Sequence, residues 1–338
     1  MSPELLDKAI AQSFQTRHAA VTFEWTGGES FLVGIDFYRQ VAESQERYAS
    51  KGFTNTVQTS GYLFDKALID FLVEHRFHIS LTIDGPEAVH DFNRPAPRGK
   101  PSLHKILTTR DYIVERQGSC GAIVTITKRS LGREGEILDL FRSLGISYFH
   151  SNPYIYFDGH RVKEQGIALT NEDYATYFIN QFNAWFEQGQ RMPTPVTLDY
   201  ALKCLSTGSG LPNALCTFGG RCLTNFIAIA PNGDAYPCPK FIGMKAMLLG
   251  NIGGAPMGEL LSDNSLRMER LIADRVAAMN GCEEIGCNYL YLCNGGCPYY
   301  SLVAGGGKDI RSRDRLCGGK MMLFSYLDGV IASCRARS

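Results

Sequence analysis

The chain has 338 residues, is 44% hydrophobic and carries 34 basic against 34 acidic residues. This apolar content is enough for one large domain together with a smaller one. The absence of net charge argues against a general nucleic-acid-binding protein, because such proteins depend on basic surface for affinity. No window has the apolar length that a bilayer requires, and the N-terminus lacks the pattern of a signal peptide. We therefore expect a cytoplasmic protein with no nucleic-acid or membrane partner.

The first half of the chain alternates short β-rich segments with helical patterns. Five strands are predicted, at AVTFEW (20–25), TNTVQTSG (54–61), HISLTIDGP (78–86), GAIVTIT (121–127) and ISYFHSNPYI (146–155). Helical patterns separate them, at 35–52, 66–75, 103–118 and 132–145, while HDFNRPAPRGKPS (90–102) is predicted to be a loop. Strands that alternate with helices of this length predict right-handed βαβ units and a parallel sheet.

Polar or glycine-rich segments follow all five predicted strands. They are Gly27-Gly28-Glu29, Gln58 to Gly61, Asp84-Gly85-Pro86, Thr125 with Thr127, and Ser151-Asn152-Pro153. In folds of this kind the chemistry lies at the carboxyl ends of the strands. Residues 170–203 are predicted to be largely helical, and the remainder has short strands, many glycines and most of the cysteines. We therefore predict two domains, 1–203 and 204–338.

Ten of the eleven cysteines follow Tyr200. Structural disulfides are disfavoured in a cytoplasmic chain of this size, and four thiolates suit either zinc or an iron–sulfur cluster. Eight of the cysteines make two complete four-ligand sites: Cys216, Cys222, Cys238, Cys282, Cys287, Cys293, Cys297 and Cys317. Their gaps are wider than those of zinc knuckles, which favours clusters over zinc. The other three, Cys120, Cys204 and Cys334, are expected to be ordinary buried or surface residues.

Four cysteine motifs in the second half form a specific pattern. They are CTFGGRC (216–222), PNGDAYPC (231–238), GCEEIGCNYLYLCNGGC (281–297) and Cys317. This pattern resembles the SPASM domain of radical S-adenosylmethionine (SAM) enzymes. In the first half, FEWTGGES, QTSG, ISLTIDGP and HDFNR resemble strand and loop motifs of the same enzymes, so the resemblance runs from Phe23 to about Phe324. It implies a partial (β/α)6 TIM-type barrel that lacks its first strand, followed by a SPASM domain.

The resemblance also implies which residues bind the cofactors. A first auxiliary [4Fe–4S] cluster would be bound by Cys216, Cys222, Cys238 and Cys297, and a second by Cys282, Cys287, Cys293 and Cys317. S-adenosylmethionine would meet Gly27, Gly28 and Glu29 with its amino group, because carbonyls and a carboxylate suit an ammonium. Its ribose and carboxylate would meet Gln58, Ser60, Thr82 and Asp84, and Arg94 is a weaker candidate.

Two features depart from the common pattern of the family. The gap between Cys282 and Cys287 has four residues where two are common. Pro239 follows Cys238, whereas sulfatase-maturing members carry an aspartate base there, and a proline cannot accept a proton. The segments FLVGIDFYRQ and YPCPKF instead resemble the subgroup that cross-links residues in small ribosomal peptides, including cyclophane formers. No catalytic residue is assigned.

The Cys-x3-Cys-x2-Cys loop of the family does not occur in this sequence. In the family this loop binds a third [4Fe–4S] cluster through three thiolates and leaves one iron open for S-adenosylmethionine. MSPELLDKAI looks like the helix that normally follows the loop. We therefore expect that Met1 is internal to a longer protein and that the upstream codons encode the loop, with a cluster-less remnant as the alternative. The chain as given is expected not to cleave S-adenosylmethionine.

Several functions fit these observations. The favoured one is a maturase that uses a 5′-deoxyadenosyl radical to abstract hydrogen from a peptide side chain, with cross-link formation preferred. Its implied partners are a precursor peptide or protein and an electron donor of the flavodoxin or ferredoxin type. The alternatives are a non-catalytic peptide-binding remnant that keeps the auxiliary clusters, a protein like the anaerobic sulfatase-maturating enzymes, and a zinc-stabilised structural protein.

Overall fold

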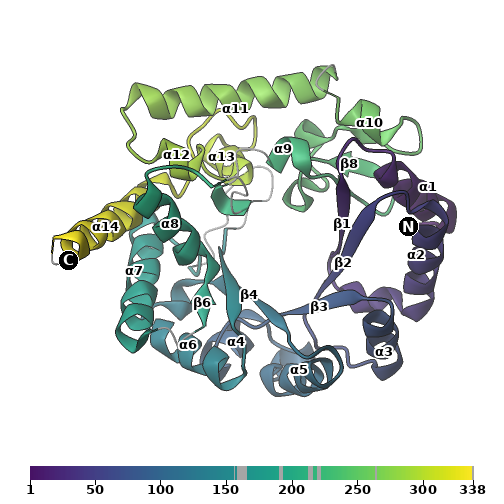
Figure 1. Cartoon of the computed structure of the whole chain (residues 1–338), viewed down its shortest axis with the longest axis horizontal. Helices are drawn as coiled ribbons and strands as arrows, with labels where there is room; N and C mark the ends of the chain where they lie inside the picture. Colours follow the sequence, from purple (N-terminus) through teal and green to yellow (C-terminus); the bar gives the residue numbers. More distant parts are fainter. Residues whose placement is uncertain are drawn as a thin grey trace. The chain divides into compact units, whose positions relative to one another are not determined.

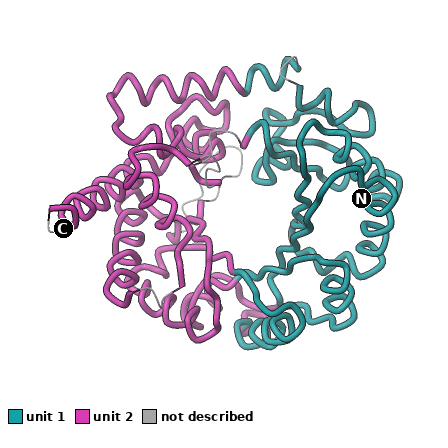
Figure 2. The backbone as a smooth tube through the Cα atoms, in the orientation of Figure 1, with its two compact units in different colours: residues 1–82, 102–121, 223–271 teal, residues 83–101, 122–222, 272–338 magenta. Residues whose placement is uncertain are grey.

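The computed structural model describes residues 1–155, 157, 166–189, 193–211, 216–218, 222–262 and 265–336. The chain divides into two compact units, which Figure 2 colours separately. Unit 1 comprises 1–82, 102–121 and 223–271, and unit 2 comprises 83–101, 122–222 and 272–338. Within the described residues, no helix combines the length and the apolar character that crossing a membrane requires.

Unit 1 contains three parallel strands in the order β1-β2-β3 (Figure 1). They are β1 (Ala20–Trp25), β2 (Gly52–Thr59) and β3 (Phe77–Thr82). Side chains alternate between the two faces of a strand, and Val57, Ile79 and Leu81 are fully buried on one face. The helices of this unit are α1 (Pro3–Phe14), α2 (Ile35–Tyr48), α3 (Lys66–Glu74), α5 (Leu103–Gln117) and the short η1 (Ser30–Val33).

A small antiparallel sheet, β7-β8-β9, also belongs to unit 1. Its strands are β7 (Ala228–Ile229), β8 (Asp234–Tyr236) and β9 (Gly250–Asn251). The turn between β7 and β8 requires glycine, because Gly233 has a φ of 89° and a Cβ there would lie 2.9 Å from Asn251 Oδ1. Short helices complete the unit: α9 (Cys222–Asn225), η6 (Pro239–Phe241), η7 (Lys245–Met247) and α10 (Met257–Leu260).

Unit 2 contains three further parallel strands in the order β4-β5-β6. They are β4 (Gly121–Ile126), β5 (Tyr148–Pro153) and β6 (Thr194–Pro195). Its first group of helices is α4 (Glu87–Asn93), η2 (Pro97–Gly99), η3 (Lys128–Ser130), α6 (Glu134–Ser143), α7 (Asn171–Gln188) and α8 (Val196–Thr207). The cysteine-rich part adds η5 (Cys216–Phe218), the end of α11 (Leu266–Glu284), α12 (Leu290–Cys293), α13 (Pro298–Ala304) and α14 (Cys317–Arg335).

The α/β fold and the five strands predicted from the sequence are confirmed, with ends that differ by a few residues. The predicted loop at 90–102 is wrong in its first part, because α4 extends to Asn93. Pro86 precedes this helix, and Val89 and His90 are buried from it. The sixth strand, β6, was missed because two residues carry no periodicity. The domain boundary after Lys203 stays a prediction.

Helix α14, which carries the last predicted ligand, packs along α7 through a glycine. The Gly319 N–H donates to Asn171 Oδ1 at 2.8 Å. A Cβ at Gly319 would lie 2.4 Å from the Asn171 carbonyl oxygen, which is closer than real Cβ contacts. The start of α14 therefore depends on the absence of a side chain at this position.

We expect Gly319→Ala to lower the free energy of unfolding by about 1–3 kcal/mol, because the methyl group forces the two helices apart. Gly329→Ala is the control at an exposed position of the same helix, since a Cβ there meets nothing within 4 Å. It should leave stability unchanged or raise it by up to about 1 kcal/mol. Urea denaturation of the metal-free variants measures both. A Gly319→Ala variant as stable as the wild type would contradict the close packing.

Candidate functional site

The carboxylate of Glu29 joins the ends of two strands in unit 1. It follows the Gly27-Gly28 pair in the loop after β1 and caps η1. Its Oε1 accepts from the Phe31 N–H at 3.0 Å and the Thr59 hydroxyl at 2.5 Å. Its Oε2 accepts from the Ser60 N–H at 3.1 Å and from the Ser60 hydroxyl. Four donors thus occupy the roughly four acceptor positions of a carboxylate.

Several of the residues predicted to contact S-adenosylmethionine form hydrogen bonds or ion pairs with one another. Gln58 Nε2 donates to Thr82 Oγ1 at 3.0 Å in unit 1. In unit 2, the fully buried Asp84 forms an ion pair with Arg94 at 2.8 Å and accepts from the Thr125 N–H at 2.8 Å. Thr59 donates a hydrogen bond to Glu29 and Thr125 donates one to Asp84, although the sequence predicted no binding role for either threonine. That these residues contact S-adenosylmethionine stays a prediction.

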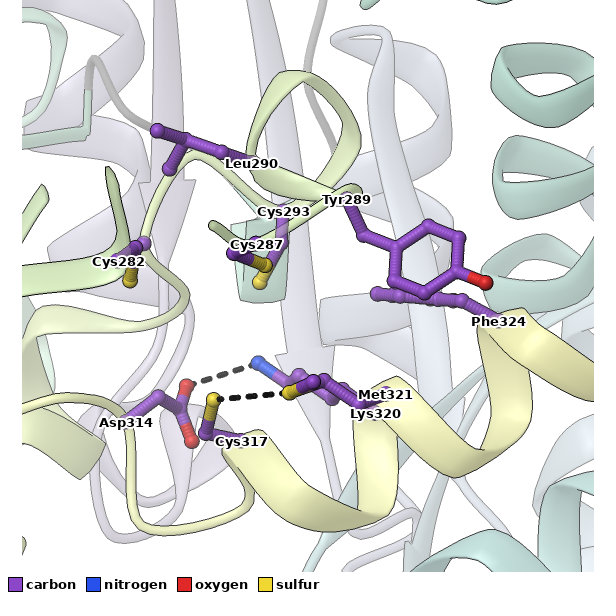
Figure 3. Close-up of a pocket in the computed structure, with 11 residues that line it drawn as sticks. Cys282, Cys287, Tyr289, Leu290, Cys293, Asp314, Cys317, Lys320, Met321 and Phe324 are labelled. Carbon is purple, nitrogen blue, oxygen red and sulfur yellow. Dashed lines mark hydrogen bonds and ion pairs between the residues drawn. The ribbon is translucent and has the colours of Figure 1, made fainter. Parts of the chain in front are cut away.

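The four cysteines of the predicted second cluster site line one cavity in unit 2, as Figure 3 shows. Cys282 comes from the end of α11, Cys287 from the loop after it, Cys293 from the end of α12 and Cys317 from the start of α14. About 340 Å³ among the lining side chains is not filled by protein atoms, a figure that includes space open to solvent. The long 282–287 gap closes on itself, because the Cys287 N–H donates to the Cys282 carbonyl at 3.1 Å. Both thiols therefore reach the cavity despite the extra residues.

A tight turn sets the direction of the chain between Cys293 and Cys297. Asn294, Gly295 and Gly296 all have positive φ, from 48° to 79°. Arg275 donates to the carbonyl oxygens of all three residues, at 3.1 Å to Gly295 and 2.6 Å to Gly296. Glycine is needed at position 296 also for space, because a Cβ there would lie 2.3 Å from Asp314 Oδ2.

A buried ion pair lies beside the cavity. Lys320 Nζ is 2.8 Å from Asp314 Oδ2, and the two side chains are 1% and 2% exposed. Burial alone would lower the pKa of Lys320, but the Asp314 carboxylate together with the neighbouring Cys293 and Tyr174 more than offsets it, so this pKa is raised. Removing one partner of such a pair costs roughly 3–5 kcal/mol, because it leaves an uncompensated buried charge. Neither residue could be singled out from the sequence.

The thiols of the cavity are in an environment that disfavours their charged form. Burial raises the pKa of the Cys293 thiol to about 12, and it also raises the pKa of Cys282 and Cys317. Thiolates in such a place need a positive charge close by, which iron supplies as it displaces the thiol protons. Four soft donors around one cavity therefore fit an iron–sulfur cluster. Among the described residues, no three Cys, His, Asp or Glu side chains form a site for a single metal ion.

The predicted first cluster site is described only in parts. Cys216 begins η5 and Cys297 precedes α13, both in unit 2. Cys222 also belongs to unit 2, and the rest of α9, which it begins, belongs to unit 1. Cys238 precedes η6 in unit 1, and Gly219-Gly220-Arg221 lies outside the described residues. This ligand set stays a prediction. The three cysteines that were left out of both sets do not line the described cavity: Cys120, Cys204 and Cys334.

Several curated proteins resemble this chain over nearly its whole length. No model of a known protein family matches it. The serine-type anaerobic sulfatase-maturating enzyme of Klebsiella aerogenes is 26% identical over 331 residues, which cover 95% of this chain and 77% of that protein. The cysteine-type anaerobic sulfatase-maturating enzyme of Clostridium perfringens (strain 13 / Type A) is 25% identical over 305 residues, covering 88% and 79%.

Two solved structures share the fold. Native anSMEcpe with bound AdoMet and Kp18Cys peptide has a TM-score of 0.83 at 21% identity, covering 100% of this chain and 91% of that chain. Streptococcus suis SuiB bound to precursor peptide SuiA has a TM-score of 0.62 at 15% identity, covering 94% and 69%. The fold is therefore that of a radical SAM enzyme with a SPASM domain, as the motifs predicted. The two curated relatives, at 25–26% identity, are anaerobic sulfatase-maturating enzymes.

We expect Cys293→Ser to lose about four irons per chain and most of the visible cluster absorbance after anaerobic reconstitution. Soluble yield should fall as well, because metal binding and folding are coupled. Cys222→Ser should cause the same losses, because Cys222 is a predicted ligand of the first cluster site. Iron analysis and absorbance spectra measure the effect.

Cys120→Ser and Cys334→Ser are the controls. Cys120 is the better matched of the two, because it is buried and burial raises its pKa to about 11. Both controls should keep the iron content of the wild type. Equal damage in either one would contradict the assignment of the eight ligands.

Proposed function

We propose that this protein is a radical SAM/SPASM maturase that modifies a side chain of a ribosomally made peptide or protein, with cross-linking as the favoured outcome. The observation that carries the proposal is the cavity into which Cys282, Cys287, Cys293 and Cys317 converge. A cluster domain of this kind, on a fold shared with maturases, supports chemistry on a peptide side chain. The peptides present in the anSMEcpe and SuiB structures support the substrate class.

Pro239 favours cross-linking over formylglycine formation. It occupies the first position of η6, directly after Cys238, where sulfatase-maturing members carry an aspartate. A pyrrolidine ring has neither a proton to give nor a lone pair to accept one. The second candidate is a sulfatase-maturating activity, which the identity of 26% over 95% of this chain favours. It would require a proton acceptor from another position.

The residues of this chain would act by holding and orienting cofactors. The two sets of four cysteines would bind two auxiliary [4Fe–4S] clusters, which supply electron transfer when bound. Glu29, Gln58, Ser60 and Thr82 would offer polar groups to S-adenosylmethionine at the strand ends of unit 1. Thiolates of this kind need a reducing compartment, so we infer the cytoplasm and a flavodoxin or ferredoxin as electron donor.

We expect this chain, reconstituted anaerobically, to bind about eight irons with matching sulfide, the content of two [4Fe–4S] clusters. With S-adenosylmethionine and dithionite it should form no 5′-deoxyadenosine, because the sequence has no Cys-x3-Cys-x2-Cys loop to bind the cluster that activates the cofactor. Iron and sulfide analysis and product chromatography measure the two quantities.

Each half of this prediction has its own contrary outcome. Two zinc ions per chain and no labile sulfide would overturn the cluster assignment and leave a zinc-stabilised structural protein. Formation of 5′-deoxyadenosine by this chain would instead overturn our account of the missing loop. The second result would leave the maturase proposal intact.

A further inference from the structure

The Asp314 carboxylate joins segments that belong to different predicted cluster sites. Its Oδ2 accepts from the Cys297 N–H at 2.8 Å, and Cys297 is a predicted ligand of the first site. Its Oδ1 accepts from the Leu316 N–H at 2.7 Å, one residue before Cys317 of the second site. One buried side chain therefore fixes the backbone at a ligand of each site.

The Lys320 ammonium reaches toward both predicted sites as well. It donates to the Thr217 carbonyl at 3.0 Å, next to Cys216 of the first site. It also lines the cavity that holds Cys293 of the second site, and its charge acts on that thiol (Figure 3). The rings of Phe218 and Tyr300 flank it, with centroids 5.0 and 5.9 Å from Nζ. These contacts hold the Lys320 ammonium in place.

This arrangement is costly to build, which argues that the charges themselves are used. Taking a lysine and an aspartate out of water costs several kcal/mol for each ion, and apolar residues of similar volume are often as stable. Asp314 also requires glycine at 296, because a Cβ there would occupy the place of its carboxylate. A cluster held by four thiolates is net negative, and its reduction potential depends on nearby charge.

We propose that the Lys320–Asp314 pair couples the two predicted cluster sites. Asp314 ties the Cys297 and Leu316 backbones together, and Lys320 holds a fixed positive charge at the second cavity that raises the reduction potential of a cluster bound there. The electron-transfer half of this inference rests on the proposed function. The part of the proposal that concerns the backbone rests on hydrogen bonds within this chain, so it applies to the metal-free protein as well.

The test of the charge is a cycle of three variants. Lys320→Met leaves Asp314 uncompensated and should make reduction of the second cluster about tenfold less favourable, a shift of about 59 mV to more negative potential. Asp314→Asn leaves Lys320 uncompensated and should shift the potential in the opposite direction. The double variant should return close to the wild type. Anaerobic redox titration followed by electron paramagnetic resonance measures all three.

Opposite shifts distinguish a charge effect from structural damage, which would move both single variants the same way. Lys203→Met is the matched control, because Lys203 pairs with Asp199 at 2.7 Å on an exposed surface and should shift nothing. Lys320→Arg keeps the charge, and its potential should stay near that of the wild type. Equal shifts of the same sign in Lys320→Met and Asp314→Asn would overturn the tuning role.

The backbone half has a separate measurement on metal-free protein. Asp314→Ala should expose both Cys297 and Cys317 to faster alkylation than in the wild type, while Cys120 should react as before. Faster reaction at only one of the two cysteines would overturn the coupling. Wild-type protein that binds no iron or sulfide would instead overturn the proposed function, and the alkylation result would still decide the coupling.

Discussion

The gathering of four thiols around one cavity is the constraint on which the cysteine-rich part depends. Each thiol must lose its proton to bind iron, yet burial already raises the pKa of three of them. Four thiolates without a counter-charge would repel one another and lack hydration. The cavity therefore needs a bound cation to be stable in its ligating form, and Lys320 supplies only one positive charge toward it. Metal binding at this cavity would thus be coupled to the local fold in one equilibrium.

Backbone geometry around the cavity follows from the same need. The thiols come from helix ends and turns, where short segments can aim a side chain in a direction that a continuous helix does not allow. The turn at Asn294 to Gly296 holds three successive residues at positive φ, which only glycine and asparagine adopt readily. Arg275 binds the carbonyl groups that this turn leaves without helical partners. The motif CNGGC is therefore a turn motif that also carries two of the predicted ligands.

The sequence could predict the features that depend on periodicity and spacing. Strand β1 begins and ends where the apolar pattern indicated, and the cysteine motifs identified the four residues of the described cavity. Helix α4 and strand β6 could not be predicted, because one follows a proline and leads into a proline-rich loop while the other has only two residues. Lys320 looks like a surface lysine in the sequence, since almost all lysines are exposed. Its partners lie as far as 103 residues away in the chain.

Motifs also cannot say whether a polar group is free to bind a ligand. Glu29 was predicted to meet an ammonium, yet four donors of its own chain already surround its carboxylate. Two of these donors are hydroxyl groups, on Thr59 and Ser60, and a hydroxyl can rotate its proton toward another acceptor. An ammonium could therefore take their place while the two backbone N–H groups keep the carboxylate in position. Binding of an ammonium would thus exchange two hydroxyl donors for one cationic donor and would leave the two backbone donors of Glu29 in place.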